Sequence, residues 1–126
     1  MSRAVFEYSL VRVVPRPERG ERVNVGVIVY CREQGFLGAR CVLDAGRLLA
    51  LDSGVDVDGV SRALEGVQAV CQGGAGAGAA SVADAGRRFR WLTAPRSTVV
   101  QPGPVHSGLT LDPAGEMERL ARLLVC

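Results

Sequence analysis

The first third of the chain alternates apolar and polar positions, as half-buried β-strands do. Strands are expected over residues 5–14 and 23–29, joined by a turn at 15–21 that contains two prolines and Gly20. Closing the hairpin symmetrically about this turn places Val13 opposite Asn24 and fixes the register. One face of the hairpin then holds Phe6, Tyr8, Leu10, Val14, Val23, Val25, Val27 and Val29.

A third strand is expected over 37–43, with Cys31 opposite Leu37 across a loop near 32–36. Its core side would carry Leu37, Ala39, Cys41 and Leu43. Gly26 lies on the other face of the second strand, where a missing side chain often admits a close neighbour. Residues Ser97–Gln101 are expected to add an edge strand that Pro102 ends.

Helical spacing with capping residues appears in the rest of the chain. Asp44 is expected to cap a short helix through Leu51, and Asp56 a longer one that runs to Gln72 and ends at Gly73. A further helix is expected over 83–91. The last begins with Asp112 as cap and Pro113 at its first position, and its apolar face holds Met117, Leu120, Ala121 and Leu124.

These elements predict an α+β fold. We expect an antiparallel three- to four-stranded meander sheet, helices packed on one face, and a C-terminal helix. The other side of the sheet would then stay partly open. The whole chain, 1–126, is expected to be a single domain, and the run GGAGAGAA at 73–80 to be a flexible low-complexity connector within it.

Composition limits the classes of protein that fit. All fifteen basic residues are arginine, and the net charge of +2 is too small to indicate nucleic-acid binding by itself. The four cysteines lack CxxC spacing, and the expected register separates Cys31 and Cys41 by roughly 13 Å, too far for a disulfide. No apolar run approaches the ~20 residues of a membrane span, and no secretion signal begins the chain. A reduced cytoplasmic protein that does not enter membranes is expected.

Two motif matches fail in context, so we expect no metal and no cofactor. Gly74, Gly76 and Ala79 match a dinucleotide-binding glycine pattern, but the run follows a helix instead of a strand. The segment 54–65 resembles a calcium loop, but Gly54 offers no carboxylate at the first ligand position. A helix that begins after Asp56, with the Asp56 side chain as its cap, accounts for the same residues without requiring a full set of calcium ligands.

The stretch 91–110 holds the only Trp and the only His of the chain and is expected to be mostly a shaped surface loop. Together with Ser97 or Thr98 and with Asp112, His106 supplies the residue types of a catalytic triad. There is no nucleophile elbow, and only geometry defines such a triad. No catalytic residue is assigned; His106 and Ser97 remain candidates for an enzyme, and His106 is expected to fix the loop backbone.

Arginines gather around the tryptophan in a pattern that favours phosphate and base binding. The phosphate or base candidates are Arg87, Arg88, Arg90, Trp91 and Arg96. The alternative is a solvated basic helix end on which Trp91 is buried as a core anchor.

Two stretches, EYSLVRVVPRPERGERVNVGVIVYC and FRWLTAPRSTVVQPGPVHSGLT, resemble the bacterial DUF3037 family, and the resemblance covers nearly the whole chain. It implies no activity, because the family has none established. Its members often lie beside genes for HipA-like kinases, which implies a protein partner or regulator. The stretches contain Arg12, Pro15, Arg19, Gly20, Glu21, Asn24, Val25 and Gly26, then Pro95, Arg96, Ser97, Pro104, Val105 and His106.

We expect the two stretches to form two sides of one polar binding groove. Its residues would be Arg19, Glu21, Asn24, Arg96, Ser97, Gln101 and His106. The expected function is a small non-enzymatic accessory module that binds a protein partner, with a HipA-like kinase as the candidate. The alternative is a nucleotide or nucleic-acid phosphate-binding protein that uses the Arg/Trp surface, and a His-dependent enzyme comes third.

Overall fold

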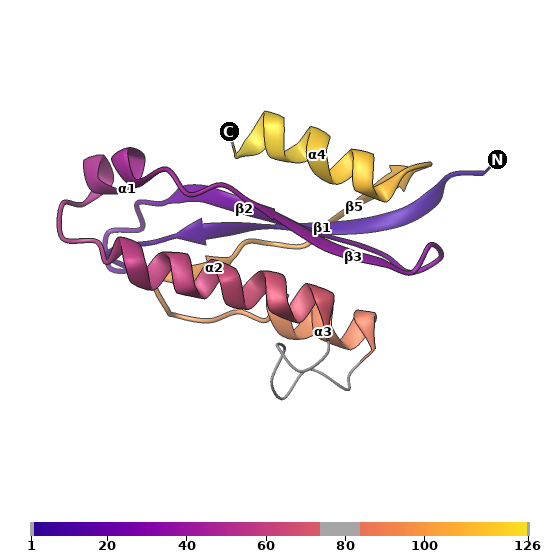
Figure 1. Cartoon of the computed structure of the whole chain (residues 1–126), viewed down its shortest axis with the longest axis horizontal. Helices are drawn as coiled ribbons and strands as arrows, with labels where there is room; N and C mark the ends of the chain where they lie inside the picture. Colours follow the sequence, from indigo (N-terminus) through magenta and orange to yellow (C-terminus); the bar gives the residue numbers. More distant parts are fainter. Residues whose placement is uncertain (1, 74–83, 126) are drawn as a thin grey trace.

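An antiparallel sheet lies between helices on its two faces in the computed structural model, which describes residues 2–73 and 84–125 (Figure 1). The strands are β1 (Ala4–Val13), β2 (Val23–Cys31), β3 (Phe36–Cys41), β4 (Val100–Pro102) and β5 (His106–Thr110). The helices are α1 (Ala45–Leu51), α2 (Val57–Gln72), α3 (Ala85–Thr93) and α4 (Pro113–Leu124). The α+β class, the antiparallel sheet and the C-terminal helix are therefore confirmed.

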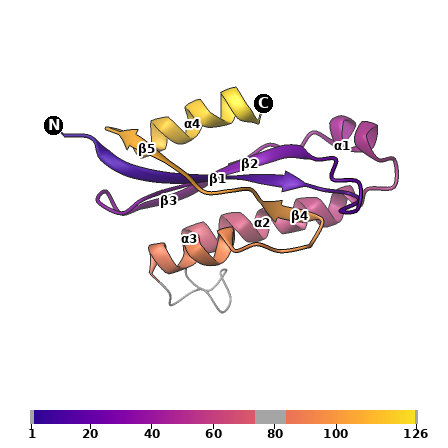
Figure 2. The same cartoon turned by 180° about the vertical axis from the view of Figure 1, so that it is seen from behind.

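Strand β1 is the centre of the sheet, because it pairs with β2 along one edge and with both β4 and β5 along the other (Figure 2). Strand β4 pairs with residues 11–13 of β1, and β5 pairs with residues 4–8. The edge strand expected at Ser97–Gln101 is shorter, begins three residues later at Val100, and includes Pro102, which had been expected to end it. Strand β5 had been expected to be loop, and it raises the sheet to five strands.

The hairpin register is right along most of its length and wrong near the turn. Between Glu7 and Val11 the pairs are those that the symmetrical turn predicts, with Val11 opposite Gly26. A bulge then shifts the register by one residue, so Val13 lies opposite Val23 instead of Asn24. Consequently Val23 and Val25 pack on the face opposite to that of Val27 and Val29.

The third strand was predicted one residue out of register. Cys31 lies opposite Phe36, not Leu37, and the strand ends at Cys41 before reaching Leu43, which is 38% exposed. The expectation for Gly26 is correct. A Cβ there would lie 3.0 Å from Cys41 Sγ and 3.2 Å from the Arg40 carbonyl oxygen.

Both faces of the sheet are covered, whereas one had been expected to stay partly open. Helices α2 and α3 lie on one face and α4 lies on the other (Figure 1). The first buried cluster includes Val11, Val13, Val25, Ile28, Leu64 and Phe89, and the second includes Phe6, Val27, Val29, Cys31, Leu120 and Ala121. Each cluster removes apolar surface from water and stabilises its own layer.

The predicted helix boundaries are largely confirmed. Asp44 caps α1, and the side chain of Asp56 accepts a hydrogen bond from the Gly59 amide at 2.9 Å to cap α2. Gly73 ends α2 with a φ of 75°, a conformation that suits glycine. Helix α3 begins at Ala85 after Asp84 as cap, two residues later than predicted.

The predictions for α4 are confirmed only in part. Pro113 does begin α4, but the side chain of Asp112 makes no capping hydrogen bond. Leu124, expected on the buried face of α4, is 38% exposed. The glycine-rich connector beyond Gly73, including the dinucleotide-like pattern from Gly74 onward, lies outside the described residues.

Candidate functional site

A small pocket of 240 Å³ lies between the β1–β2 turn and the loop that leads from α3 to β4; it is called the turn pocket below. It is lined by Arg12, Val14, Pro17, Gly20, Arg22, Arg96, Ser97, Gln101 and Pro102. Residues from both family-like stretches therefore meet here. The turn reaches this position because Gly20 adopts a φ of 71°.

The predicted groove residues are divided by the structure. Arg96, Ser97 and Gln101 do line the turn pocket together with the hairpin turn. Arg19 and Glu21 instead form an ion pair with each other at 2.8 Å, and both line a neighbouring depression. Asn24 donates a hydrogen bond of 3.1 Å to the Leu124 carbonyl at the end of α4, which places its amide in a structural contact.

His106 lies at a distance from the turn pocket. It is exposed at the start of β5, opposite Tyr8, and the two rings lie 5.2 Å apart. Gln101 is opposite Arg12. Since Tyr8 and Arg12 are four residues apart on one strand, His106 and Gln101 are separated by roughly 13 Å along the sheet.

The residue types of a triad are likewise spread along the chain. His106 begins β5 and Asp112 follows the far end of the same strand. The hydroxyl of Thr98 donates to the Val100 carbonyl oxygen at 2.6 Å, so it serves its own loop. A catalytic triad needs its members within hydrogen-bond reach of one another, and over residues 2–73 and 84–125 no hydrogen bond joins these side chains.

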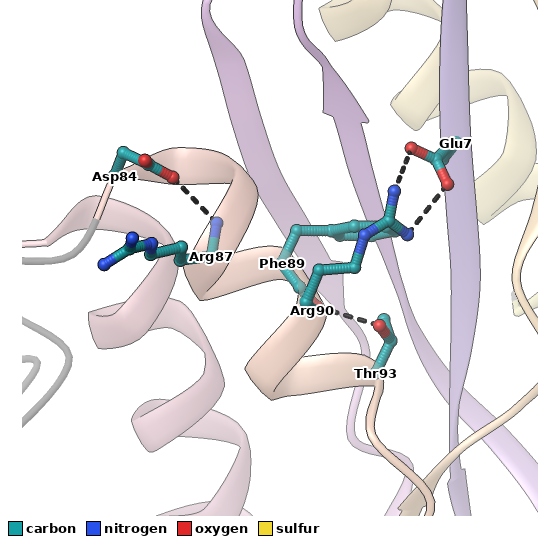
Figure 3. Close-up of polar contacts among 6 residues, drawn as sticks. All are labelled: Glu7, Asp84, Arg87, Phe89, Arg90 and Thr93. Carbon is teal, nitrogen blue, oxygen red and sulfur yellow. Dashed lines mark hydrogen bonds and ion pairs between the residues drawn. The ribbon is translucent and has the colours of Figure 1, made fainter.

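Helix α3 is fastened to the sheet by a bidentate ion pair (Figure 3). The Arg90 guanidinium donates to both carboxylate oxygens of Glu7, at 2.9 and 2.8 Å. These hydrogen bonds raise the pKa of Arg90 above its ordinary value. On the same helix, Phe89 is fully buried and stacks on Tyr30 with ring centroids 5.3 Å apart.

Trp91 is 55% exposed, so the expectation of a buried core anchor is wrong for this residue, and Phe89 takes that place. The guanidinium of Arg96 lies 5.2 Å from the centre of the Trp91 ring. The same group donates a hydrogen bond of 2.6 Å to the Trp91 carbonyl oxygen. Arg96 and Trp91 therefore hold each other at the surface.

The remaining arginines of α3 extend in different directions. Arg87 and Arg90 leave the helix on different sides in Figure 3. Arg88 reaches back to α2, where a Cβ on Gly73 would lie 3.0 Å from its Nη1. Trp91 and Arg96 thus contact each other, Arg88 lies against the end of α2, and Arg87 and Arg90 line a hollow beside the start of α3. The five residues expected to bind phosphate or bases therefore do not form one patch.

A larger hollow of 870 Å³ lies between the N-terminal end of α3 and the end of the sheet; it is called the α3 hollow. It is lined by Val5, Glu7, Tyr30, Arg32, Glu33, Gly35, Asp84, Ala85, Gly86, Arg87 and Arg90. Val5 pairs across the sheet with Leu109, and the two side chains are 56% and 59% exposed. Cross-strand partners share a face, so together they form an apolar surface at the mouth of this hollow.

Sequence reasoning overlooked several of these residues. Val5 and Leu109 could have been found as apolar residues on the side of their strands that faces away from Phe6, but Leu109 required recognising β5. Arg12 lies inside the first family-like stretch, but its valine neighbours indicated a core strand, so it was not predicted to be a groove residue. Glu7 gave no signal, since its partner Arg90 is 83 residues away.

Over residues 2–73 and 84–125, no three His, Cys, Asp or Glu side chains come together in a way that could hold a metal ion. Within the same ranges, no helix has both the length and the apolar character needed to cross a membrane.

A family model described as a protein of unknown function, DUF3037, matches residues 8–125. The chain belongs to the DUF3037 family. Comparison with curated proteins and with solved structures gave no significant match. The DUF3037 match contains the turn pocket, α3 and β5, while Val5 and Glu7 precede it.

Proposed function

We propose that this DUF3037 protein is a small non-enzymatic accessory module that binds a protein partner through the mouth of the α3 hollow. The partner that the family's gene neighbourhood implies is a HipA-like kinase. The proposal rests on the exposed apolar pair Val5 and Leu109, which lies beside a hollow with a charged rim.

The chemistry of this surface resembles that of protein interfaces. Isolated exposed apolar residues are ordinary, but a cross-strand pair beside a hollow offers contiguous apolar area. Around it stand charged groups, including the Glu7–Arg90 pair and Arg32. An apolar centre surrounded by a polar rim is the usual anatomy of a protein–protein contact.

The surface is also held in place before any partner arrives. Phe89 anchors α3 in the core, and the bidentate bond from Arg90 to Glu7 ties the helix to β1 close to Val5. A rigid contact surface loses less conformational entropy on binding than a mobile one. This supports recognition of a folded partner.

The proposal is tested by isothermal titration of the protein with a purified HipA-like kinase, the partner that the family's gene neighbourhood implies. Leu109→Asp places a charge in the proposed apolar contact and should weaken binding at least tenfold, as for loss of an interface contact worth about 1.4 kcal/mol. Leu123→Asp is the matched control, because Leu123 is 65% exposed on α4, on the other side of the sheet.

Two outcomes would contradict the proposal. One is the absence of any complex between the two purified proteins at low salt. The other is equal weakening by Leu109→Asp and Leu123→Asp, since this would show that added negative charge, and not the apolar surface, controls binding.

Nucleotide or nucleic-acid binding through the Arg/Trp surface ranks second as a proposal. Exposed Trp91 offers a ring face, but Arg90 and Arg96 already make intramolecular contacts that a phosphate would have to displace. A His-dependent enzyme ranks third, because His106 lies away from Ser97, the other candidate for catalysis.

A further inference from the structure

The turn pocket contains an arginine whose hydrogen-bonding capacity is incompletely used. Nε of Arg12 is inaccessible to solvent and has no hydrogen-bond partner among the described residues. The guanidinium lies over Gly103, where a Cβ would come within 2.9 Å of Cζ. Leaving a buried donor unpaired is costly, and an anion in the turn pocket, which Arg12 lines, would offset part of this cost by its attraction to the guanidinium charge.

The charge around Arg12 is unbalanced. Arg22 also lines the pocket, and no Asp or Glu is among the lining residues. The pKa of Arg12 is lowered first by burial and then by the positive charge of Arg22. Two acids beside the turn are engaged elsewhere, since Glu21 pairs with Arg19 and Asp52 pairs with Arg16. Glu18 is exposed in the turn and does not line the pocket.

Polar groups from the second family-like stretch complete the pocket. Gln101 is the cross-strand partner of Arg12, so the two side chains leave the sheet on the same face. Ser97 also lines the pocket. A hydroxyl and an amide beside two guanidinium groups form a suitable donor set for the oxygens of an anion.

We propose that the turn pocket binds the phosphomonoester group of a small phosphorylated molecule, with Arg12 and Arg22 as its cationic ligands and Ser97 and Gln101 as further donors. Two positive charges match the dianion that a phosphomonoester forms above its second pKa of about 6. The planar fork of arginine suits phosphate oxygens. This site is separate from the α3 hollow, which lies toward the other end of β1.

The volume of the pocket limits its ligand. At 240 Å³ it is smaller than the roughly 300–1,000 Å³ of sites that enclose a whole drug-sized molecule. One phosphate group with a few attached atoms fits this space. The rest of a larger ligand would extend into solvent, where this pocket offers it no recognition.

Isothermal titration of the full chain tests the proposal at pH 8 and at an ionic strength held constant with chloride. Inorganic phosphate and glycerol 3-phosphate are the probes, and neutral glycerol is the control ligand. Both phosphates should bind saturably at a single site, whereas glycerol should not bind. Each phosphate should also raise the melting temperature of the protein as its concentration exceeds Kd.

Variants assign the binding to the turn pocket. Arg22→Gln should weaken phosphate binding at least tenfold, the scale of one lost charge-assisted hydrogen bond, and should stay folded because Arg22 is exposed. Arg12→Lys keeps the charge but loses the fork, and should weaken binding by a smaller factor. Arg62→Gln removes an equal charge from the exposed surface of α2 and should leave the affinity unchanged.

The proposal is overturned if neither phosphate binds saturably. It is also overturned if Arg22→Gln binds phosphate as tightly as the unmodified protein, or if Arg62→Gln weakens binding as much as Arg22→Gln does. Circular dichroism of each variant confirms that folded protein is compared in every titration.

Discussion

Ser9 is the clearest place to test how the two family-like stretches are held together. Its side chain is fully buried in β1, and its hydroxyl donates a hydrogen bond of 2.8 Å to the carbonyl oxygen of Gly103 in the segment between β4 and β5. Gly103 is itself buried, and its amide bonds to the Leu10 carbonyl at 2.7 Å. Ser9 therefore fastens β1 to the segment that links β4 and β5, the two strands that pair with the same edge of β1.

Ser9→Ala removes this bond while keeping the small size of the side chain. The net worth of the hydrogen bond is about 0.5–1.5 kcal/mol, and an unpaired buried carbonyl adds a penalty that brings the expected loss of unfolding free energy to about 1–2 kcal/mol. No cavity of the size left by a deleted leucine is created, so the loss should stay below the ~2.7–5 kcal/mol of such deletions.

Urea unfolding followed by circular dichroism measures the effect. With a urea slope of about 2 kcal/mol/M, the midpoint should fall by roughly 0.5–1 M with the slope unchanged. Ser107→Ala is the control, because Ser107 is exposed on β5 and should change stability by less than about 0.5 kcal/mol. An unshifted midpoint for Ser9→Ala, or equal shifts for both variants, would refute the reasoning.

Two further predictions concern α3 and the buried thiols. Phe89→Ala should lower the free energy of unfolding by about 3–5 kcal/mol because the ring is fully buried. Trp91→Ala, at a half-exposed position on the same helix, should lower it by less than half as much in the same urea assay. Equal losses for the two variants would contradict the assignment of Phe89 as the core anchor. Burial raises the pKa of Cys71 to about 12. Above the unfolded-state thiol pKa near 9, the unfolded chain releases this proton and the folded chain does not, so the free energy of unfolding should fall as pH rises from 9 to 11. Urea midpoints measured at several pH values should decline less steeply for Cys71→Ala than for the unmodified protein. An equally steep decline for both proteins would contradict this prediction.

The sequence was sufficient for those parts of the fold that depend on local patterns. Helix caps at Asp44 and Asp56 and the stop at Gly73 were correct because each is determined within one turn of helix. The hairpin register was correct between Glu7 and Val11 because turn and alternation agree there. The bulge beside Val25 was missed because a run of valines at every second position fits either face of a sheet that is covered on both sides.

Long-range pairing was harder to predict. Strand β5 contains Gly108 and mostly exposed side chains, so it lacks the alternation that indicates a strand. The prediction of a binding groove put Arg96 and Ser97 beside the turn, and they lie there because β4 pairs with the end of β1. The same prediction put His106 in the groove, but the chain does not fold back after β4 and instead continues along β1 as β5.

The way β1 shares one edge between β4 and β5 has a consequence for biosynthesis. The β1–β2 hairpin can form as soon as its residues leave the ribosome, yet the strands that complete β1 lie about seventy residues later, at 100–110. Until they emerge, the nascent chain exposes an unpaired edge of ten strand residues, a template for association with other chains. A slow translation rate between β2 and β4 would lengthen that exposure, and a chaperone that shields strand edges would shorten it.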